Sequence, residues 1–251
     1  MNFAGTIYAL WLREILQFKR NWSRLIGSMA LPLIFFLILG SGYGSVFQYR
    51  NDVSYMQFIG PGIVAMSLLF SSMVGGLTVM WDRQFGFLKE ILVAPVSRVA
   101  IMAGKTSGTV TTAMLRGLVF LVAMLFAGLL KGSIPGIALA LVFMFLISAS
   151  FVSLGIAVAT VMEDPHGFQL VMNFLIMPVF FLSGALFPVE HLPKWLMLLT
   201  HLNPLTYGVD GMRFALGVPH FFPPFFDLTL LVLFWMATTL LGAFLFSRMP
   251  A

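Results

Sequence analysis

Long apolar stretches, separated by short charged ones, divide this chain into six segments of membrane-spanning length. An α-helix needs about 20 apolar residues to cross a bilayer. None of the six carries Asp, Glu, Lys or Arg except the third, which contains Arg116. The predicted spans are 25–46, 58–81, 106–130, 134–162, 168–187 and 228–246. The pattern therefore predicts an all-α integral membrane protein that forms one transmembrane domain over residues 1–251.

Residues 3–22 have a different pattern, typical of an amphipathic helix. An apolar face recurs at three- and four-residue steps, and a polar, mostly basic face lies beside it. The apolar face comprises Tyr8, Trp11, Leu12, Ile15, Phe18 and Trp22, and the polar face comprises Arg13, Gln17, Arg20 and Arg24. Such a helix is expected in the membrane interface. The alternative is a solvated helix that packs on the protein's own cytoplasmic side.

Residues 188–225 are apolar but too irregular for a continuous span. They contain six prolines and four charged residues, with room for short helices at 194–202 and 205–216. Irregular backbone at membrane depth must be buried in protein or face water. We expect re-entrant or interfacial helices at the outer side, between the fifth and sixth spans.

Composition supports the membrane assignment and the orientation. The chain is 60% hydrophobic and 9% charged, whereas soluble domains carry about 25% charged residues. The net charge of +5 fits membrane orientation better than nucleic-acid binding, because the basic residues adjoin the spans. Under the positive-inside rule, a cytoplasmic N- and C-terminus is favoured. That orientation places Arg13, Lys19, Arg20, Arg24, Arg83, Lys89, Arg98, Lys105 and Arg248 inside, against Arg50, Lys131, Lys194 and Arg213 outside.

Catalytic and metal-binding patterns are missing from the sequence. There is no cysteine, and the four histidines lack ligand-like spacing. The stretch 103–106 reads Ala-Gly-Lys-Thr, like the end of a phosphate-binding loop, but Val99 occupies the position of the required first glycine. We therefore expect no metal site, no nucleotide hydrolysis by this chain, and a role for Lys105 as an anchor of the third span at the interface.

Arg116 is the single charge well inside a predicted span. A charge at this depth is costly unless it is paired, so it is a candidate functional residue. Glu163, Asp164 and Asp52 are possible partners. Both a structural buried pair and a role in transport remain open.

The densest run of charge, at 82–98, reads DRQFGFLKEILVAPVSR. It predicts a short amphipathic docking helix for a soluble partner, and we call it the charged segment. This run and LNPLTYGVDGMR at 202–213, with an interfacial helix and six spans, resemble the membrane permease subunit of bacterial type-2 ABC exporters, which move drugs, lipids and polysaccharides. The resemblance covers essentially the whole chain. Asp82 stands where many members of that family carry Glu.

The resemblance implies a homodimer of this subunit with two copies of a separate ABC ATPase, which would bind the ATP and Mg. A cytoplasmic coupling segment at 82–105 would dock on the ATPase, with a smaller contact at 163–167. Leu88, Ile91 and Leu92 would form an apolar ridge in it, and Pro95 would end its helix. The implied ATPase-coupling residues are Asp82, Arg83, Phe85, Gly86, Leu88, Lys89, Glu90, Leu92, Pro95, Arg98, Glu163 and Asp164.

Two further sites follow from the resemblance. Substrate would pass between two copies along the first, second and fifth spans, with Asn173, Phe174, Phe180, Phe181, Phe187 and Arg116 as path residues. A packed lipid-facing helix would show the same phenylalanines. The outer element before the last span comprises Asn203, Pro204, Tyr207, Asp210 and Arg213.

The expected function is that of a permease subunit, not itself an enzyme, in the bacterial cytoplasmic (inner) membrane. It would couple ATP hydrolysis by its partner to export of an amphipathic or lipid-like substrate, in contact with membrane lipids and without nucleic acid. The alternatives are a secondary carrier or channel and, with less support, a membrane-embedded lipid-metabolising enzyme.

Overall fold

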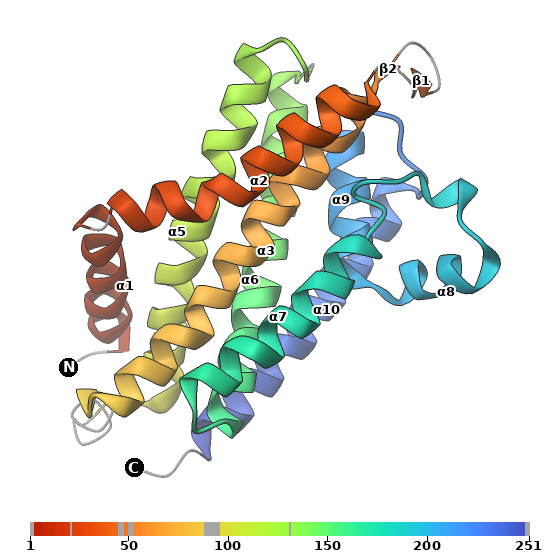
Figure 1. Ribbon diagram of the computed structural model, residues 1–251. Helices are drawn as coiled ribbons and strands as arrows, with labels where there is room; N and C mark the ends of the chain where they lie inside the picture. The colour runs from red at the N-terminus through yellow and green to blue at the C-terminus, as the bar shows by residue number, and fades with distance from the viewer. Residues whose placement is uncertain are drawn as a thin grey trace.

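The computed structural model describes residues 3–20, 22–44, 48–49, 53–87, 96–130 and 132–248 (Figure 1). These residues form a helical bundle with one two-stranded hairpin. Its elements are α1 (Phe3–Arg20), α2 (Trp22–Tyr43), β1 (Gln48–Tyr49), β2 (Val53–Ser54), α3 (Tyr55–Gln84), α5 (Arg98–Phe126), α6 (Ile134–Val161), α7 (Pro165–Phe181), the 3-10 helix η1 (Val189–His191), α8 (Lys194–Leu202), α9 (Pro204–Ala215) and α10 (Pro224–Ser247). Both chain termini, the end of α3 and the α6–α7 turn lie at the lower end of Figure 1. We call this the terminal end.

Four of the described helices are long and apolar enough to cross a membrane: α3, α5, α6 and α10. The stretch Gly27–Tyr43 of α2 and the whole of α7 are apolar but shorter. The all-α membrane fold is thus confirmed, whereas the count of six spans stays a prediction. The hairpin, in which Gln48 pairs with Ser54 and Tyr49 with Val53, lies between α2 and α3, in the stretch between the first two predicted spans.

Serine side chains define the start of three of the long helices. Ser54 and Gln57 form a reciprocal capping box at α3. Ser97 accepts a hydrogen bond from the backbone N–H of Ala100, 3.1 Å away, at the start of α5. The helix that we expected from residue 106 therefore begins at Arg98, and the coupling segment predicted to extend to residue 105 ends within α5. Ser133 caps α6 in the same way.

The core lies where α3 passes against α6, and small residues allow this close contact. The side chains of Ile59, Ile63 and Leu68 on α3 are completely buried. A Cβ atom on Gly76 would overlap the backbone carbonyl oxygen of Gly155 on α6. The two backbones thus approach each other directly, as small residues permit between membrane helices.

Replacement of Gly76 by alanine is expected to destabilise the bundle by about 1–3 kcal/mol, the usual cost of an overpacked core. The obstacle is backbone, which cannot rotate away as a side chain can. The matched control is Gly42→Ala on α2, because nothing lies within 4 Å of a Cβ there. Thermal unfolding of both variants in detergent measures the difference. Equal loss of stability in the two would contradict the close α3–α6 contact.

Helix α1 packs along α5, and the two run in the same direction (Figure 1). A Cβ on Gly104 would lie 2.9 Å from Leu10 Cβ, and one on Gly108 would lie 2.6 Å from Glu14 Cβ. The face of α1 that is buried comprises Thr6, Leu10 and Glu14. Tyr8, from the predicted apolar face, is 60% exposed and thus does not pack on α5. Because the glycines of α5 have no side chains, α1 approaches α5 closely enough for polar residues to be buried between them. The spacing of apolar residues along α1 does not predict such a contact. The interfacial position of α1 stays a prediction.

Candidate functional site

A buried carboxylate joins three helices at the point where the charged segment leaves α3. Asp82 is 7% exposed. Arg13 of α1 donates two hydrogen bonds to its two oxygens, over 2.8 and 3.0 Å. The ammonium of Lys105 on α5, which is 1% exposed, forms a second ion pair with the same carboxylate. We call Arg13, Asp82 and Lys105 the ion triad.

The ion triad bears on two expectations. Asp82, one of the implied ATPase-coupling residues, is buried and faces the interior of the protein, and its part in coupling stays a prediction. Lys105, expected to anchor the third span at the membrane interface, lies within α5, because this helix begins at Arg98, and pairs with Asp82. A buried ion needs a partner of opposite charge because desolvation costs several kcal/mol. Since Asp82 lies in the last turn of α3 and Lys105 lies near the start of α5, their pair closes the loop that contains the charged segment.

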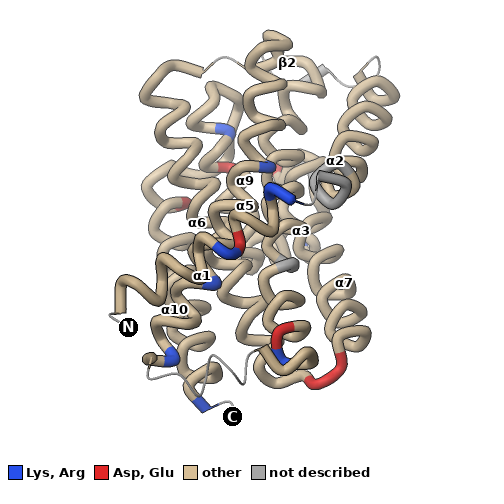
Figure 2. Tube along the Cα trace, turned by 90° about the vertical axis from the view of Figure 1, so that its left-hand side faces the viewer, with Lys and Arg blue, Asp and Glu red and all other residues tan. Residues whose placement is uncertain are grey.

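Two other cations of the charged segment connect it to the remaining helices of the terminal end. Arg83 donates a hydrogen bond to the carbonyl oxygen of Met162, 3.1 Å away, and lies 3.9 Å from the carboxylate of Glu163. Arg98 donates to the carbonyl oxygen of Ser247, at 2.8 Å. The two ends of the segment are thus connected to the α6–α7 turn and to the end of α10. Figure 2 shows charged residues at this end and others spread through the middle of the molecule.

The part of the charged segment that faces outward begins at Phe85, which is 80% exposed. Gly86 follows with φ of +78°, a conformation that favours glycine and turns the chain away from α3. Phe87 turns back, and its ring lies 4.0 Å from the guanidinium of Arg13. The predicted coupling residues Leu88, Lys89, Glu90, Leu92 and Pro95 lie outside the described residues and stay predictions.

The α6–α7 turn presents two exposed acids at the same end. Glu163 is 89% exposed at its side chain. Asp164 begins α7 by accepting hydrogen bonds from the backbone N–H groups of Gly167 (2.6 Å) and His166 (3.2 Å). The bond from Gly167, followed by that from His166, lowers the pKa of Asp164. This cap is present while the carboxylate is ionised and is lost as the pH falls through the lowered pKa.

The pair of Arg83 and Glu163 is expected to contribute little to stability. Glu163→Gln should change the free energy of unfolding by less than about 1 kcal/mol, because the pair is solvent-exposed and long. Arg83→Gln should cost more, since it also removes the hydrogen bond to Met162. Chemical denaturation in detergent, at low and high salt, measures both. A loss of several kcal/mol in Glu163→Gln would contradict the solvent-exposed geometry.

Arg116 belongs to the contact between α1 and α5. It is 4% exposed, and its guanidinium lies 5.3 Å from the ring of Phe18. Of the acids named as possible partners, Glu163 lies by Arg83 and Asp164 caps α7. Asp52 lies outside the described residues. The structure places Arg116 with α1, apart from the phenylalanines of α7 that were expected to share a path with it.

The other path residues divide between buried and exposed positions. Phe180 is fully buried, and its ring and that of Phe181 lie 6.5 and 6.4 Å from the ring of Phe35, so that α2 and α7 are neighbours. Phe174 is 83% exposed, Phe181 45% and Phe187 48%. Asn173 is exposed beside Phe174. An amide on an apolar surface is costly in lipid, so this face of α7 is better suited to a polar or protein environment.

The residues of the outer element are mostly buried, and their side chains form hydrogen bonds with neighbouring segments of the chain. The guanidinium of Arg213 is 3.8 Å from the ring of Phe58 on α3 and donates to the carbonyl oxygens of Gly184 (2.8 Å) and Ala185 (3.2 Å). Its Nε lies 3.4 Å from the carbonyl oxygen of Phe58. Arg213 thereby connects α9 to α3 and to the loop after α7.

Three other side chains of the outer element form hydrogen bonds with neighbouring segments. Asp210 accepts hydrogen bonds of 2.7–3.0 Å from the backbone N–H groups of Phe221 and Phe222. The Asn203 amide donates to the carbonyl oxygen of Val179 on α7, and Pro204 is the first residue of α9. The hydroxyl of Tyr207 donates to the carbonyl oxygen of His201. These groups position α8 and α9, which lie on the right of Figure 1, away from α1 and the ends of the chain.

Sequence reasoning missed the roles of Arg13 and Lys105, which are 69 and 23 positions from Asp82. Ser97 was the available signal, since a serine before a helical run predicts a helix start and would have placed Lys105 inside α5. No comparable signal connects Arg13 to Asp82. Asp227, which is fully buried at the start of α10, was also passed over.

Comparison with known proteins confirms the resemblance. The family described as "ABC-2 type transporter" matches residues 6–217. The chain is 30% identical over 214 residues to "Inner membrane transport permease YadH" of Escherichia coli K12, covering 84% of this chain and 82% of that protein. It is 29% identical to "Nodulation protein J" of Neorhizobium galegae, with 84% and 81% covered, and 28% identical to "Putative transport permease ycf38" of Cyanophora paradoxa, with 84% and 74% covered. The chain therefore belongs to the ABC-2 type transporter family and is the multi-pass membrane subunit of an ABC transporter.

Proposed function

We propose that this chain couples ATP hydrolysis, carried out by a separate ABC ATPase, to export of an amphipathic or lipid-like substrate across the bacterial inner membrane. The observation that carries the proposal is the set of contacts at the charged segment. Its flanking residues Asp82, Arg83 and Arg98 bond to α1, α5, the α6–α7 turn and α10. A force applied to the segment would thus reach most of the helices at the terminal end.

The mechanism is a rigid-body movement. ATP binding closes the two partner ATPases, and their closure displaces the charged segments of two copies of this chain. Because the Asp82–Lys105 pair closes the loop of the segment, α3 and α5 move together and carry α1 with them. Rotation of such packed units at an interface is a known form of switching. The exposed residues Phe85, Glu163 and Asp164 would face the ATPase.

The substrate route lies, on this proposal, between two copies at the faces of α2 and α7. Both helices expose large apolar side chains, such as Ile38 at 64% and Leu170 at 72%. Asn173 gives this surface a polar group, which favours contact with a second copy or an amphipathic substrate over contact with lipid alone. A relative that is named as a transport permease supports the transport role.

Purification of the tagged chain from its native membrane in mild detergent tests the proposal. The expected result is a soluble chain with a complete phosphate-binding loop, recovered in equal amount and active in ATP hydrolysis. Substitution of the exposed Phe85 by Asp should reduce its recovery, whereas Phe126→Asp, at the opposite end of α5, should not. Recovery of this chain alone, even after cross-linking, would favour a secondary carrier instead.

A further inference from the structure

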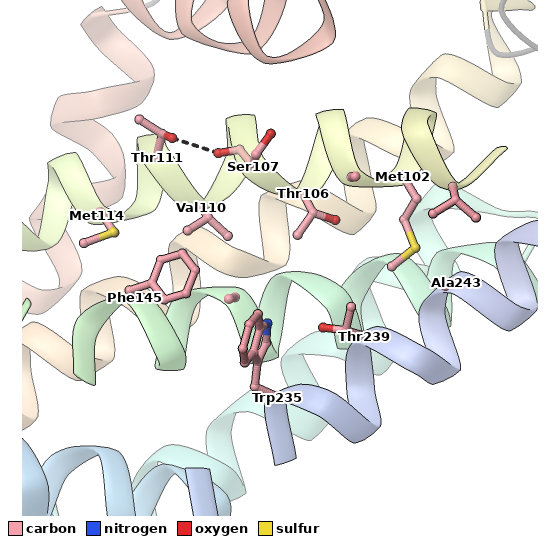
Figure 3. Close-up of a pocket in the computed structure, with 13 residues that line it drawn as sticks. Met102, Thr106, Ser107, Val110, Thr111, Met114, Phe145, Trp235, Thr239 and Ala243 are labelled. Atoms are coloured by element: carbon pink, nitrogen blue, oxygen red, sulfur yellow. Dashed lines mark hydrogen bonds between the residues drawn. The ribbon is translucent and has the colours of Figure 1, made fainter. Parts of the chain in front are cut away.

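A groove of about 340 Å³ lies between α5, α6 and α10, away from the ion triad and the α2–α7 face (Figure 3). This volume lies within the range of about 300–1,000 Å³ that small-molecule sites occupy. The groove is apolar and is lined mainly by aliphatic, sulfur-containing and aromatic side chains, among them Met102, Val110, Met114, Phe145 and Trp235. It suits a hydrocarbon chain.

The hydroxyl groups in the α5 wall add little polarity to the groove. The hydroxyl oxygen of Thr106 is buried, and no described residue forms a hydrogen bond with it. Figure 3 shows Thr106 on the side of α5 toward α6 and α10, and Ser107 and Thr111 on the other side of this helix. Thr111 bonds to the carbonyl oxygen of Ser107 and to the indole of Trp11. The groove therefore offers a ligand mainly apolar contacts.

Two arginines lie at the end of the groove nearest the terminal end. Val99 in the first turn of α5 and Ala243 near the end of α10 line the groove. Arg98 precedes Val99, and its guanidinium bonds to the carbonyl oxygen of Ser247, 2.8 Å away. Arg248 follows Ser247 directly, is exposed, and lies 4.2 Å from the ring of Phe244. The first turn of α5 contains no acidic residue, so among the described residues of the first turn of α5 and the end of α10 the charged side chains are these two arginines.

We propose that the groove binds an anionic phospholipid, with an acyl chain along α5 and α10 and the phosphate between Arg98 and Arg248. The apolar groove would complement the acyl chain of such a lipid, and the two arginines at its end would complement the phosphate. Basic side chains beside a membrane attract anionic lipids by about 1 kcal/mol each. The bound lipid would hold the start of α5 to the end of α10, and it is distinct from the exported substrate.

Native mass spectrometry of the full chain, exchanged into detergent with equal amounts of phosphatidylglycerol and phosphatidylcholine, tests this. Wild type is expected to retain phosphatidylglycerol preferentially. Arg248→Gln should lower that preference about fivefold and Arg98→Gln/Arg248→Gln about 25-fold, from the attraction per cation. Lys194→Gln, an exposed cation on α8, is the matched control and should change nothing.

A second variant tests the groove separately from the charges. Ala243→Leu fills the lumen and leaves both arginines in place, so it should reduce retention of both lipids. Size-exclusion profiles and thermal unfolding in lipid-free detergent show whether each variant is folded. Equal retention of the two lipids by wild type, or an unchanged preference in the double arginine variant, would overturn the headgroup site. Undiminished retention by Ala243→Leu would overturn the groove.

Discussion

Asp82→Asn is expected to destabilise the protein by about 3–5 kcal/mol, the cost of removing one partner from a buried ion pair. The substitution keeps the size of the side chain but leaves Lys105, which is 1% exposed, without its opposite charge. Arg13 would lose the paired hydrogen bonds that hold α1. Denaturant unfolding in detergent measures the loss, and ATP-driven transport should fall with it.

A double variant shows whether the loss of stability comes from the unpaired charge of Lys105 or from any substitution at this site. Asp82→Asn/Lys105→Met removes the uncompensated cation together with the acid, so it should regain a large part of the stability lost in Asp82→Asn. Glu163→Gln, an exposed acid at the same end, is the matched control. A double variant as unstable as the single one would show that the Lys105 charge does not cause the defect.

Arg213→Met is the second substitution with a large expected effect, a loss of about 3 kcal/mol or more. It removes the donor to two carbonyl oxygens of the loop after α7, and each buried acceptor left unsatisfied costs about 1–3 kcal/mol. The cation–π contact with Phe58 is lost as well. Thermal unfolding and protease sensitivity of the loop are the measurements.

Arg213→Lys should recover only part of the loss. Lysine retains the charge but lacks the planar fork that reaches several acceptors at once. Lys194→Met, an exposed cation of the neighbouring helix α8, is expected to leave stability nearly unchanged. Full stability in Arg213→Met would mean that the outer element does not hold the loop after α7 in place.

The sequence predicted the helices well and their contacts poorly, for a physical reason. Hydropathy reports which stretches avoid water, so α6, expected at 134–162, was found at Ile134–Val161, and α8 at Lys194–Leu202. Helix starts depend on caps, and the unrecognised Ser97 cap put the start of α5 eight residues too late.

The site was less predictable, because pairing of charges is a property of packing. Asp82 and Arg213 were singled out from their motifs, but both proved to be buried. The ion triad joins positions 13, 82 and 105, and no periodicity along the chain connects them. The side of α1 that packs on α5 could not be predicted either, because it includes Glu14, which lies against Gly108 of α5.

A cross-link from a single cysteine tests most directly whether the charged segment contacts the ATPase. The chain has no cysteine, so Phe85→Cys, at an 80% exposed position, introduces a unique thiol. Phe126→Cys, at an 89% exposed position at the other end of α5, is the control. With a short thiol-to-amine reagent in native membranes, we expect a product with an ABC ATPase from Phe85→Cys alone. No product from Phe85→Cys, or equal products from both positions, would contradict the coupling role of this segment.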